Sequence, residues 1–279
     1  MKKQIKSNTI EKMIGTLSAK FSKVSKLVDG YKKIKEANQI CSHFSSYLEP
    51  VIADSPELKN QVFQIRHHVY CDELNFEPAR EDGLETDEFD EFSQYCLIHH
   101  KNSGHYAGTV RLVTPHKKGQ LLPIEKYCLN SITNKELDPR NFPREQVCEI
   151  SRLAVPKEFR RRQMDNFAGA ATGAINTRTY SDTELRCFPF IAVGLYFTAA
   201  SLAMNKEIQH AYVMMEPRLA RSMRFIGIKF DQIGPVIDYH GRRAPYYINQ
   251  PILLKNLSRG FKTMLSHISR NVNKQLLHK

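Results

Sequence analysis

The sequence of 279 residues contains no tryptophan and no long apolar run. A membrane-spanning helix needs roughly 18 or more consecutive apolar residues, and no stretch of this sequence approaches that length. The amino terminus, MKKQIKSNTIEK, has basic residues but no apolar segment behind them, so it is not typical of a secretion signal. We therefore expect a cytoplasmic protein that is neither secreted nor integral to a membrane.

Cysteine is present without any paired arrangement. The six cysteines form no C-x-x-C motif; they are Cys41, Cys71, Cys96, Cys128, Cys148 and Cys187. In a chain of this size without a secretion signal, scattered cysteines are expected to be reduced thiols, mostly buried. His67 and His68 adjoin each other on a predicted helix without a partner at ligand spacing, so we predict no metal site.

Acidic residues are in deficit, since only 29 Asp and Glu stand against 41 Lys and Arg, which gives a net charge of +12. This excess favours an acidic partner such as nucleic acid, anionic lipid, a phosphate-bearing cofactor or an acidic carrier protein. No helix-turn-helix, RNP-like or zinc-finger pattern is present, so we expect no specific nucleic-acid partner. A basic nucleic-acid- or membrane-binding module without catalysis is the alternative from another functional class.

Both ends of the chain are basic and amphipathic. Residues 10–34 place apolar side chains three and four positions apart, and Asn8 with Glu11 fits a capping box. Residues 254–272 repeat the pattern. Two interpretations are open for these helices. They could lie on an anionic membrane surface or meet an acidic protein, or they could pack on the core, as most amphipathic helices do.

Between these ends, strands precede an alternation of helices and strands. Periodicity predicts strands near 44–52, 94–100, 105–114, 148–155, 210–215, 228–233 and 246–248. It predicts helices over 56–74 and 217–225, and a long helical region that ends in the apolar run Phe190–Met204. This order indicates an α/β fold in which a mixed sheet is flanked by helices on both faces.

Charged residues interrupt apolar segments at four places, which are FQIRHHVYCDELNF (63–76), LETDEFDEF (84–92), AGTVRLVTP (107–115) and CEISRLAV (148–155). Arg111, Glu149 and Arg152 stand inside strand-like runs, where a buried charge is costly unless it is paired. Their natural partners are Asp87 and Asp90. We therefore predict that buried ions gather around a cleft.

The order of these motifs resembles that of the acyl-homoserine-lactone synthases of the GNAT superfamily. The resemblance covers about residues 60–156 and is carried by Arg66, by Glu85, Asp87 and Asp90 (E-x-D-x-x-D), by Gly108, Arg111 and Leu112 (G-x-x-R-L), and by Glu149, Ser151 and Arg152 (E-x-S-R). The later segment RSMRFIGIKF is similar to a helix-to-strand segment near the end of GNAT domains. Taken whole, the chain looks most like the acyltransferases of exosortase systems and the long-chain N-acyl amino acid synthases.

The resemblance implies a GNAT fold and an N-acyltransferase. Such an enzyme would move a fatty acyl group from the pantetheine thioester of acyl carrier protein or coenzyme A to the amine of an amino acid or related small molecule, with no permanently bound cofactor. It also implies a GNAT-like domain over 41–250, between a basic helical extension at 1–40 and an amphipathic helix at 251–279.

The resemblance also implies roles for individual residues. Glu149 would draw a proton from the attacking amine, and Ser151 would hydrogen-bond the intermediate. A charge network would fix the amine pocket; its members are Arg66, Asp87, Asp90, Arg111 and Arg152. Glu85 is expected to be a solvated loop residue. The alternatives are that Glu149 only pairs with Arg66 or Arg152, and that the network is an ordinary surface cluster.

The strand that carries Glu149 is expected to bind the acyl donor. By resemblance, the pantetheine arm pairs with its backbone near Leu153 and Val155, and the run Arg160, Arg161 and Arg162 follows where a phosphate would arrive. A solvated basic face explains these arginines equally well. The segment KEFRRRQMDNFAGAATGA lacks the Q/R-x-x-G-x-G/A loop of coenzyme A-binding GNAT enzymes, so a carrier protein is at least an equal candidate. The apolar run Phe190–Met204 is most simply a core helix, part of which could line an acyl channel.

The missing tryptophan leaves the acceptor open. Acyl-homoserine-lactone synthases use a tryptophan near the end of the first helical region to hold S-adenosylmethionine, and Phe76 occupies that place here. A synthase that uses S-adenosylmethionine is the alternative. Arg242 and Arg243 could bind an acceptor carboxylate, although a basic turn between two strands explains them almost equally well. A peripheral contact with the inner face of the membrane is also open.

Overall fold

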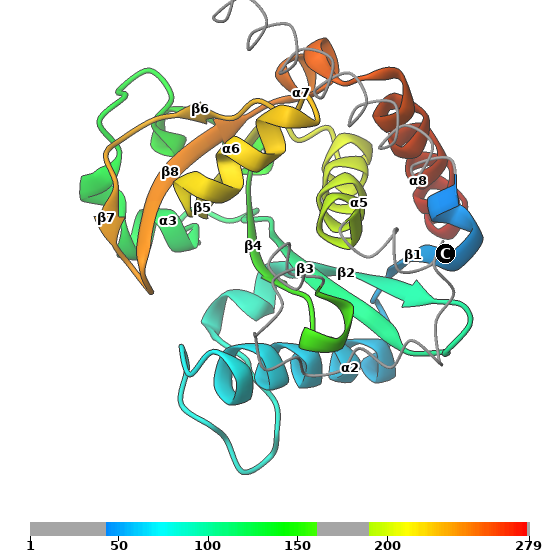
Figure 1. Ribbon diagram of the computed structural model, residues 1–279. Coiled ribbons are helices and arrows are strands. Elements are labelled where there is room, and N and C mark those ends of the chain that lie inside the picture. Colours follow the sequence, from blue (N-terminus) through cyan, green and yellow to red (C-terminus); the bar gives the residue numbers. More distant parts are fainter. Residues whose placement is uncertain (1–42, 161–189, 278–279) are drawn as a thin grey trace, which may run out of the picture.

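The computed structural model describes residues 43–160 and 190–277 (Figure 1). The helix predicted within residues 1–40 lies outside the described residues, as do Cys41, Cys187, Arg161 and Arg162. Within the described ranges, no helix has both the length and the apolar character required to cross a membrane.

One mixed sheet organises this part of the chain. Its strands are β1 (Leu48–Ile52), β2 (Ser93–His100), β3 (Tyr106–Val113), β4 (Val147–Ala154), β5 (His210–Met215), β6 (Asp231–Gln232), β7 (Ile237–Asp238) and β8 (Arg242–Ile248). Their order is β1-β2-β3-β4-β5-β8-β6, and β7 pairs with β8. Only β4 and β5 run parallel, whereas the other pairings among the described strands are antiparallel.

Helices cover both faces of the sheet, as the order of elements predicts (Figure 1). These helices are α2 (Pro56–His67), α3 (Pro123–Tyr127), α5 (Ile191–Asn205), α6 (Pro217–Phe225), α7 (Gln250–Asn256) and α8 (Arg259–Leu277). α2 begins where Ser55 accepts the N–H of Leu58, and Pro56 occupies its first turn. It continues as a π-helical turn over His68–Glu73.

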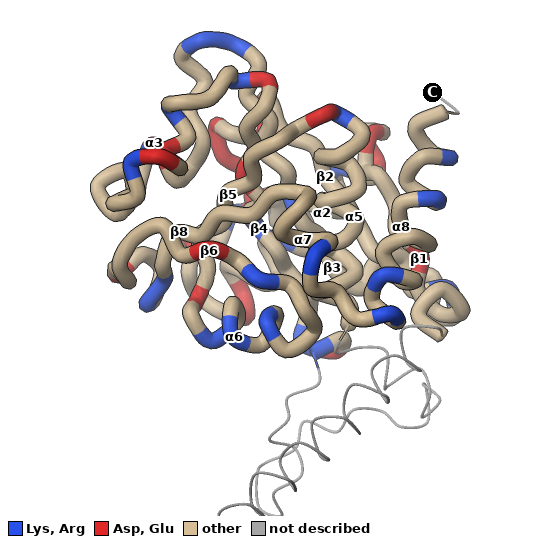
Figure 2. Tube along the Cα trace, turned by 90° about the horizontal axis from the view of Figure 1, so that it is seen from above, with Lys and Arg blue, Asp and Glu red and all other residues tan. Residues whose placement is uncertain are grey.

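The main core lies between the sheet and α5. Because α5 is apolar around most of its circumference, it is buried on nearly every side. α8 is amphipathic, and its apolar face is buried against α5 and β1; this face consists of Phe261, Met264, Leu265, Ile268 and Val272. Its Lys and Arg residues remain on the outside (Figure 2). The carboxy-terminal helix therefore packs on the core, which was one of its two interpretations.

Several predicted boundaries are wrong. Residues 43–47 are helical, and the first strand begins only at Leu48. The segment predicted as a strand over 228–233 forms only two sheet pairs, because Ile228 and Phe230 fill the core instead. The single helix predicted over 251–279 is divided into α7 and α8, because Leu257 is extended. α3 and β7 were not predicted, since each is too short to show a period.

The described cysteines are buried free thiols, as expected; they are Cys71, Cys96, Cys128 and Cys148. Burial raises the thiol pKa of Cys96 to about 12 and that of Cys128 to about 11. These two thiols therefore stay protonated near neutral pH and do not offer a ready nucleophile.

Candidate active site

The sheet register places polar residues from three strands side by side. Tyr95 on β2 lies opposite Arg111 on β3, and Arg111 lies opposite Ser151 on β4. Tyr95 packs with Val62 of α2, so this is the face that α2 covers. Glu149 lies two residues before Ser151 and shares that face, because side chains alternate along a strand. The G-x-x-R-L motif of β3 and the E-x-S-R motif of β4 are about 40 residues apart in the sequence. They therefore meet on one side of the sheet.

β4 separates from β5 beyond Glu149. Their parallel pairing covers only Val147–Glu149 and His210–Tyr212. The register against β3 also shifts along Ser151–Ala154, where Arg152 has a φ of 48°. A bulge of this kind disrupts the ladder locally and redirects a side chain. Within the described chain, the second half of β4 has no strand along the edge that faces β5, so an extended ligand could pair with its backbone there.

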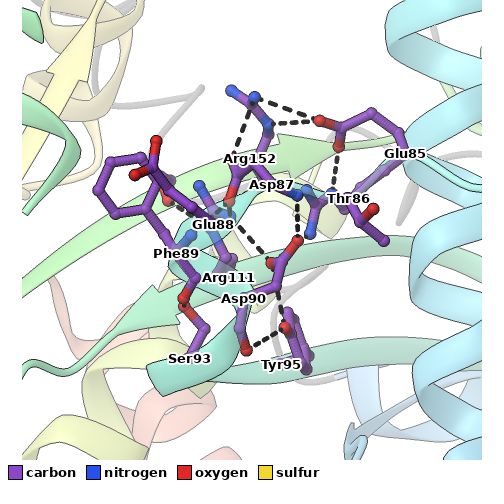
Figure 3. A network of polar contacts seen from close by, with 12 residues as sticks. Glu85, Thr86, Asp87, Glu88, Phe89, Asp90, Ser93, Tyr95, Arg111 and Arg152 are labelled. Atoms are coloured by element: carbon purple, nitrogen blue, oxygen red, sulfur yellow. Dashed lines mark hydrogen bonds and ion pairs between the residues drawn. The ribbon is translucent and has the colours of Figure 1, made fainter.

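The acidic segment around Asp87 and Asp90 forms a capping box at the start of a short helical turn that leads into β2. Asp87 accepts the N–H of Phe89, and the carboxylate of Asp90 accepts the N–H of Asp87. Asp90 Oδ1 also accepts hydrogen bonds from Arg66 Nη1 at 2.7 Å and from Arg111 Nη1 at 2.9 Å (Figure 3). Burial opposes the ionisation of Asp90, but the charges of the two arginines outweigh it and lower its pKa to about 2. This carboxylate is therefore ionised at any working pH.

Glu85 is buried, and its assignment as a solvated loop residue is wrong. It is only 1% exposed, pairs with Arg66 Nε, and lies 3.2 Å from Arg152 Nη2. Its own N–H bonds the carbonyl of Phe63 on α2. The guanidinium groups of Arg66 and Arg152 need a nearby carboxylate to balance their charge, and Glu85 therefore points into the interior.

The charge network that the sequence predicts is an interior one. Arg66 is fully buried and Arg111 is 1% exposed, so it is not a surface cluster. Arg111 pairs with Asp87 as well as Asp90, and its Nε donates to Ser151 Oγ at 3.1 Å. Arg152 completes the network through the carboxylates of Glu77, Glu85 and Asp87 (Figure 3).

Glu149 is enclosed beside this network. It is 2% exposed, and its Oε2 accepts the N–H of Ile124 at 2.7 Å. The ion pairs of Arg66 and Arg152 go to other carboxylates. Burial raises the pKa of Glu149 to about 8, because the hydrogen bond from Ile124 and the charge of Arg111 offset burial only in part. A carboxyl group that titrates near working pH is suited to general-base catalysis.

A pocket brings Glu149 together with Arg111, Ser151 and Arg152. Its remaining walls come from distant segments and are Tyr70, Phe76, Glu77, Pro123, Met214, Tyr239, His240 and Arg243. Phe76 is 37% exposed, and its ring centroid lies 6.3 Å from that of His240. Tyr70 donates a hydrogen bond to the carbonyl of Leu153 on β4 at 2.8 Å. The pocket is thus lined by charged, polar and aromatic side chains.

The other predicted site residues lie behind or beside this pocket. Arg66, Asp87 and Asp90 do not line it but hold the residues that do. Arg160 is ion-paired with Glu73 and does not line the pocket either. The sequence did not single out Tyr70, Tyr239 or His240. The φ of 47° at His240, in the segment HGRRAPYYI, marks a tight turn that a single sequence does not reveal.

A second, apolar pocket lies on the opposite face of β4. Ile150 lines it, and Ile150 alternates with Glu149 and Ser151 along the strand. α5 contributes much of the wall through Tyr196, Phe197, Ala200, Ala203 and Met204, and Ala211, Ile248 and Leu253 contribute from β5, β8 and α7. The two pockets therefore flank β4 where it separates from β5.

One group of described residues could hold a metal ion. Ligand atoms of His68, Glu73 and Glu158 all lie within 4.8 Å of one another. Glu73 already accepts the N–H of Lys157 at 2.9 Å and pairs with Arg160. The group lies apart from the residues that line the pocket with Glu149.

Comparison with known proteins gives a family match and related folds. Residues 65–169 match the family described as Acetyltransferase (GNAT) domain. No curated protein matches the sequence. BjaI, a CoA-dependent acyl-homoserine lactone synthase solved with SAM and isopentyl-CoA, aligns with a TM-score of 0.52 at 15% identity, over 80% of this chain and 89% of its own.

Two further solved structures are similar. TofI, in a ternary complex with an inhibitor and MTA, aligns with a TM-score of 0.52 at 15% identity, over 78% of this chain and 96% of its own. FeeM, an N-acyl amino acid synthase from uncultured soil microbes, aligns with a TM-score of 0.48 at 14% identity, over 75% of this chain and 94% of its own. The family match and the shared fold are those of GNAT-type acyltransferases.

Proposed function

Because residues 65–169 carry a GNAT acetyltransferase domain on a fold shared with an acyl-homoserine lactone synthase, we propose that this acyltransferase is a fatty N-acyltransferase. It moves an acyl group from a pantetheine thioester to the amine of an amino acid or related small molecule. The observation that carries this proposal is the buried Glu149, whose pKa is raised to about 8 in a pocket beside the free edge of β4.

Glu149 is the proposed base. The amine nitrogen attacks the thioester carbonyl, and its proton passes to the Glu149 carboxylate directly or through water. The tetrahedral intermediate then breaks its C–S bond, so that the amide forms and the thiolate leaves, taking up a proton. Ser151 accepts a hydrogen bond from Arg111, which leaves its own hydroxyl proton free to point toward the oxyanion.

The charge network is proposed to position these groups. Arg111 is held by Asp87 and Asp90, and Arg111 in turn orients Ser151. Because the network is buried and ion-paired on several sides, it keeps the site rigid while the acceptor exchanges.

The donor is proposed to bind along β4. Its pantetheine arm would pair with the backbone near Leu153 and Val155, where β5 no longer accompanies the strand. The acyl chain would enter the apolar pocket against α5. β4 lines both this pocket and the polar pocket, one with each of its faces. In this arrangement the thioester carbonyl lies between the two pockets, next to Glu149 and Ser151.

Acyl carrier protein is the proposed donor partner, with acyl-CoA as the second candidate. The net charge of +12 favours an acidic protein, and α6, α7 and α8 contain no acidic residue. Figure 2 shows Lys and Arg along α6 and α8. The run from Arg160 through Arg162 is proposed to meet the pantetheine phosphate.

The test is direct transfer by the purified protein. Long-chain acyl carrier protein and acyl-CoA are each supplied with a pool of the twenty standard amino acids, and products are identified by mass spectrometry. Glu149→Gln should lower the rate of amide formation by about 10²–10⁴-fold, whereas Glu145→Gln, at an exposed position just before β4, should leave it unchanged. Full activity of Glu149→Gln would show that the base is misassigned.

A synthase that takes S-adenosylmethionine is the second candidate, because BjaI shares the fold and was solved with SAM. The same assay, with S-adenosylmethionine in place of the amino acids, distinguishes the two. Acyl-homoserine lactone as the product would overturn the acceptor proposed here.

A further inference from the structure

Four arginines stand in or behind the polar pocket, and three of them are paired with carboxylates. Arg66, Arg111 and Arg152 each contact at least two acidic side chains. Arg243, on β8, lines the pocket but has neither a hydrogen bond nor an ion pair from its side chain within residues 43–160 and 190–277. The pocket therefore presents one guanidinium that the described protein does not neutralise.

Arg243 is half-buried, and the inner end of its guanidinium group is shielded from solvent. Its Nε is buried without a hydrogen-bond acceptor, and its Cζ lies 6.0 Å from the centroid of the Phe76 ring. A buried donor without an acceptor is costly, so such a group is expected to meet its acceptor in a ligand. The neighbouring Arg242 is exposed and does not line the pocket, so only the second arginine of the pair is placed to act.

The guanidinium and the base lie on two walls of one pocket. Glu149 comes from β4 and Arg243 from β8, and β5 runs between them with Met214 facing the pocket. The register places Glu149 level with Tyr212 on β5 and Tyr247 on β8, and Arg243 lies four residues further along β8. With strands about 4.8 Å apart and a rise of about 3.3 Å per residue, the two backbones are roughly 16 Å apart at these residues, and the two long side chains reach toward the pocket between them. An α-amino acid is short enough to present its nitrogen to one wall and its carboxylate to the other.

We propose that Arg243 binds the carboxylate of the acceptor, so that the acceptor is an α-amino acid or another amine that bears a nearby carboxylate. The inference rests on the proposed transfer reaction and names its substrate class. Arginine presents two parallel N–H groups to a carboxylate, which fixes orientation as well as charge. The amine is thereby directed toward Glu149, and the product keeps a free carboxylate at Arg243.

The test compares acids with their amides. Transfer to the pooled amino acids is measured against transfer to the pooled amino acid amides, for the wild type, Arg243→Met and Arg243→Lys. We expect the wild type to prefer the acids, and Arg243→Met to lower the acid-to-amide ratio of kcat/KM at least tenfold, mainly through KM. Arg243→Lys should keep part of the preference, and Arg242→Met should keep all of it.

A binding measurement decides the inference separately from turnover. The affinity of N-decanoylglycine and of N-decanoylglycinamide is measured by calorimetry for the wild type and Arg243→Met, both checked for folding by thermal melting. Tighter binding of the acid by the wild type alone supports the role of Arg243, even where no transfer is seen and the proposed reaction fails. Equal affinity for acid and amide, or a preference that persists in Arg243→Met, overturns it.

Discussion

Replacing Glu149 by Gln should change activity and stability in opposite directions. The Glu149 carboxyl has a pKa of about 8 in the folded protein against an ordinary value of 4.5. Between these two values the folded state holds a proton that the unfolded state has released. Its contribution to stability is therefore greatest below pH 4.5 and is lost as the pH rises through 8.

The magnitude follows from the shift in pKa. Each unit is worth about 1.4 kcal/mol, so the full shift corresponds to a loss on the order of 5 kcal/mol by the time Glu149 is ionised. Gln cannot ionise, so the Glu149→Gln variant does not lose this stability as the pH rises. The stability of Glu149→Gln relative to the wild type should therefore rise by about 3 kcal/mol between pH 5.5 and pH 8.5.

The assay is urea unfolding of the wild type, Glu149→Gln and the exposed control Glu145→Gln at both pH values. Other titrating groups are common to the three proteins and cancel in the comparison. In parallel, the rate of acyl transfer should rise with pH with an apparent pKa near 8 in the wild type. Removing the base should lower the rate by about 10²–10⁴-fold. A stability difference that does not change with pH would refute the burial argument.

Three further predictions concern the surroundings of the site. Arg66→Met should lower the free energy of unfolding by about 3–5 kcal/mol, because the enclosed carboxylates of Glu85 and Asp90 each lose one of the two arginines that balance them. Gly108→Ala should cost about 1–3 kcal/mol, since a Cβ would lie 2.8 Å from the carbonyl oxygen of Ala154; urea unfolding at constant pH measures both. Ala203→Leu, which narrows the apolar pocket, should shift the products toward shorter acyl chains in mass spectra. Ala192→Leu on the same helix, outside the pocket lining, should not, and an unchanged product profile in both would place the acyl chain elsewhere.

The interior position of the charge network could be predicted from the sequence. Arg111 and Glu149 stand in strands whose neighbours are apolar, and a charge in such a strand must be buried and paired. The same argument did not extend to Glu85, because the loop that carries it has no periodicity. Its burial depends on two arginines from other segments, Arg66 and Arg152, that close over it.

The amino-acid sequence alone determined the longer elements and the interior position of Arg111 and Glu149, because periodicity and the cost of burying charge are local properties of the chain. Tertiary structure alone decided which residues share a pocket. His240 and Arg243 meet Glu149 only because β8 lies beside β5 and β4 diverges from β5 after three paired residues. Tyr70 joins them because the helical turn after α2 packs over β4, where Tyr70 bonds the carbonyl of Leu153. That Arg243 remains unpaired in the described structure follows from where the carboxylates lie in space, and no pattern along the chain records it.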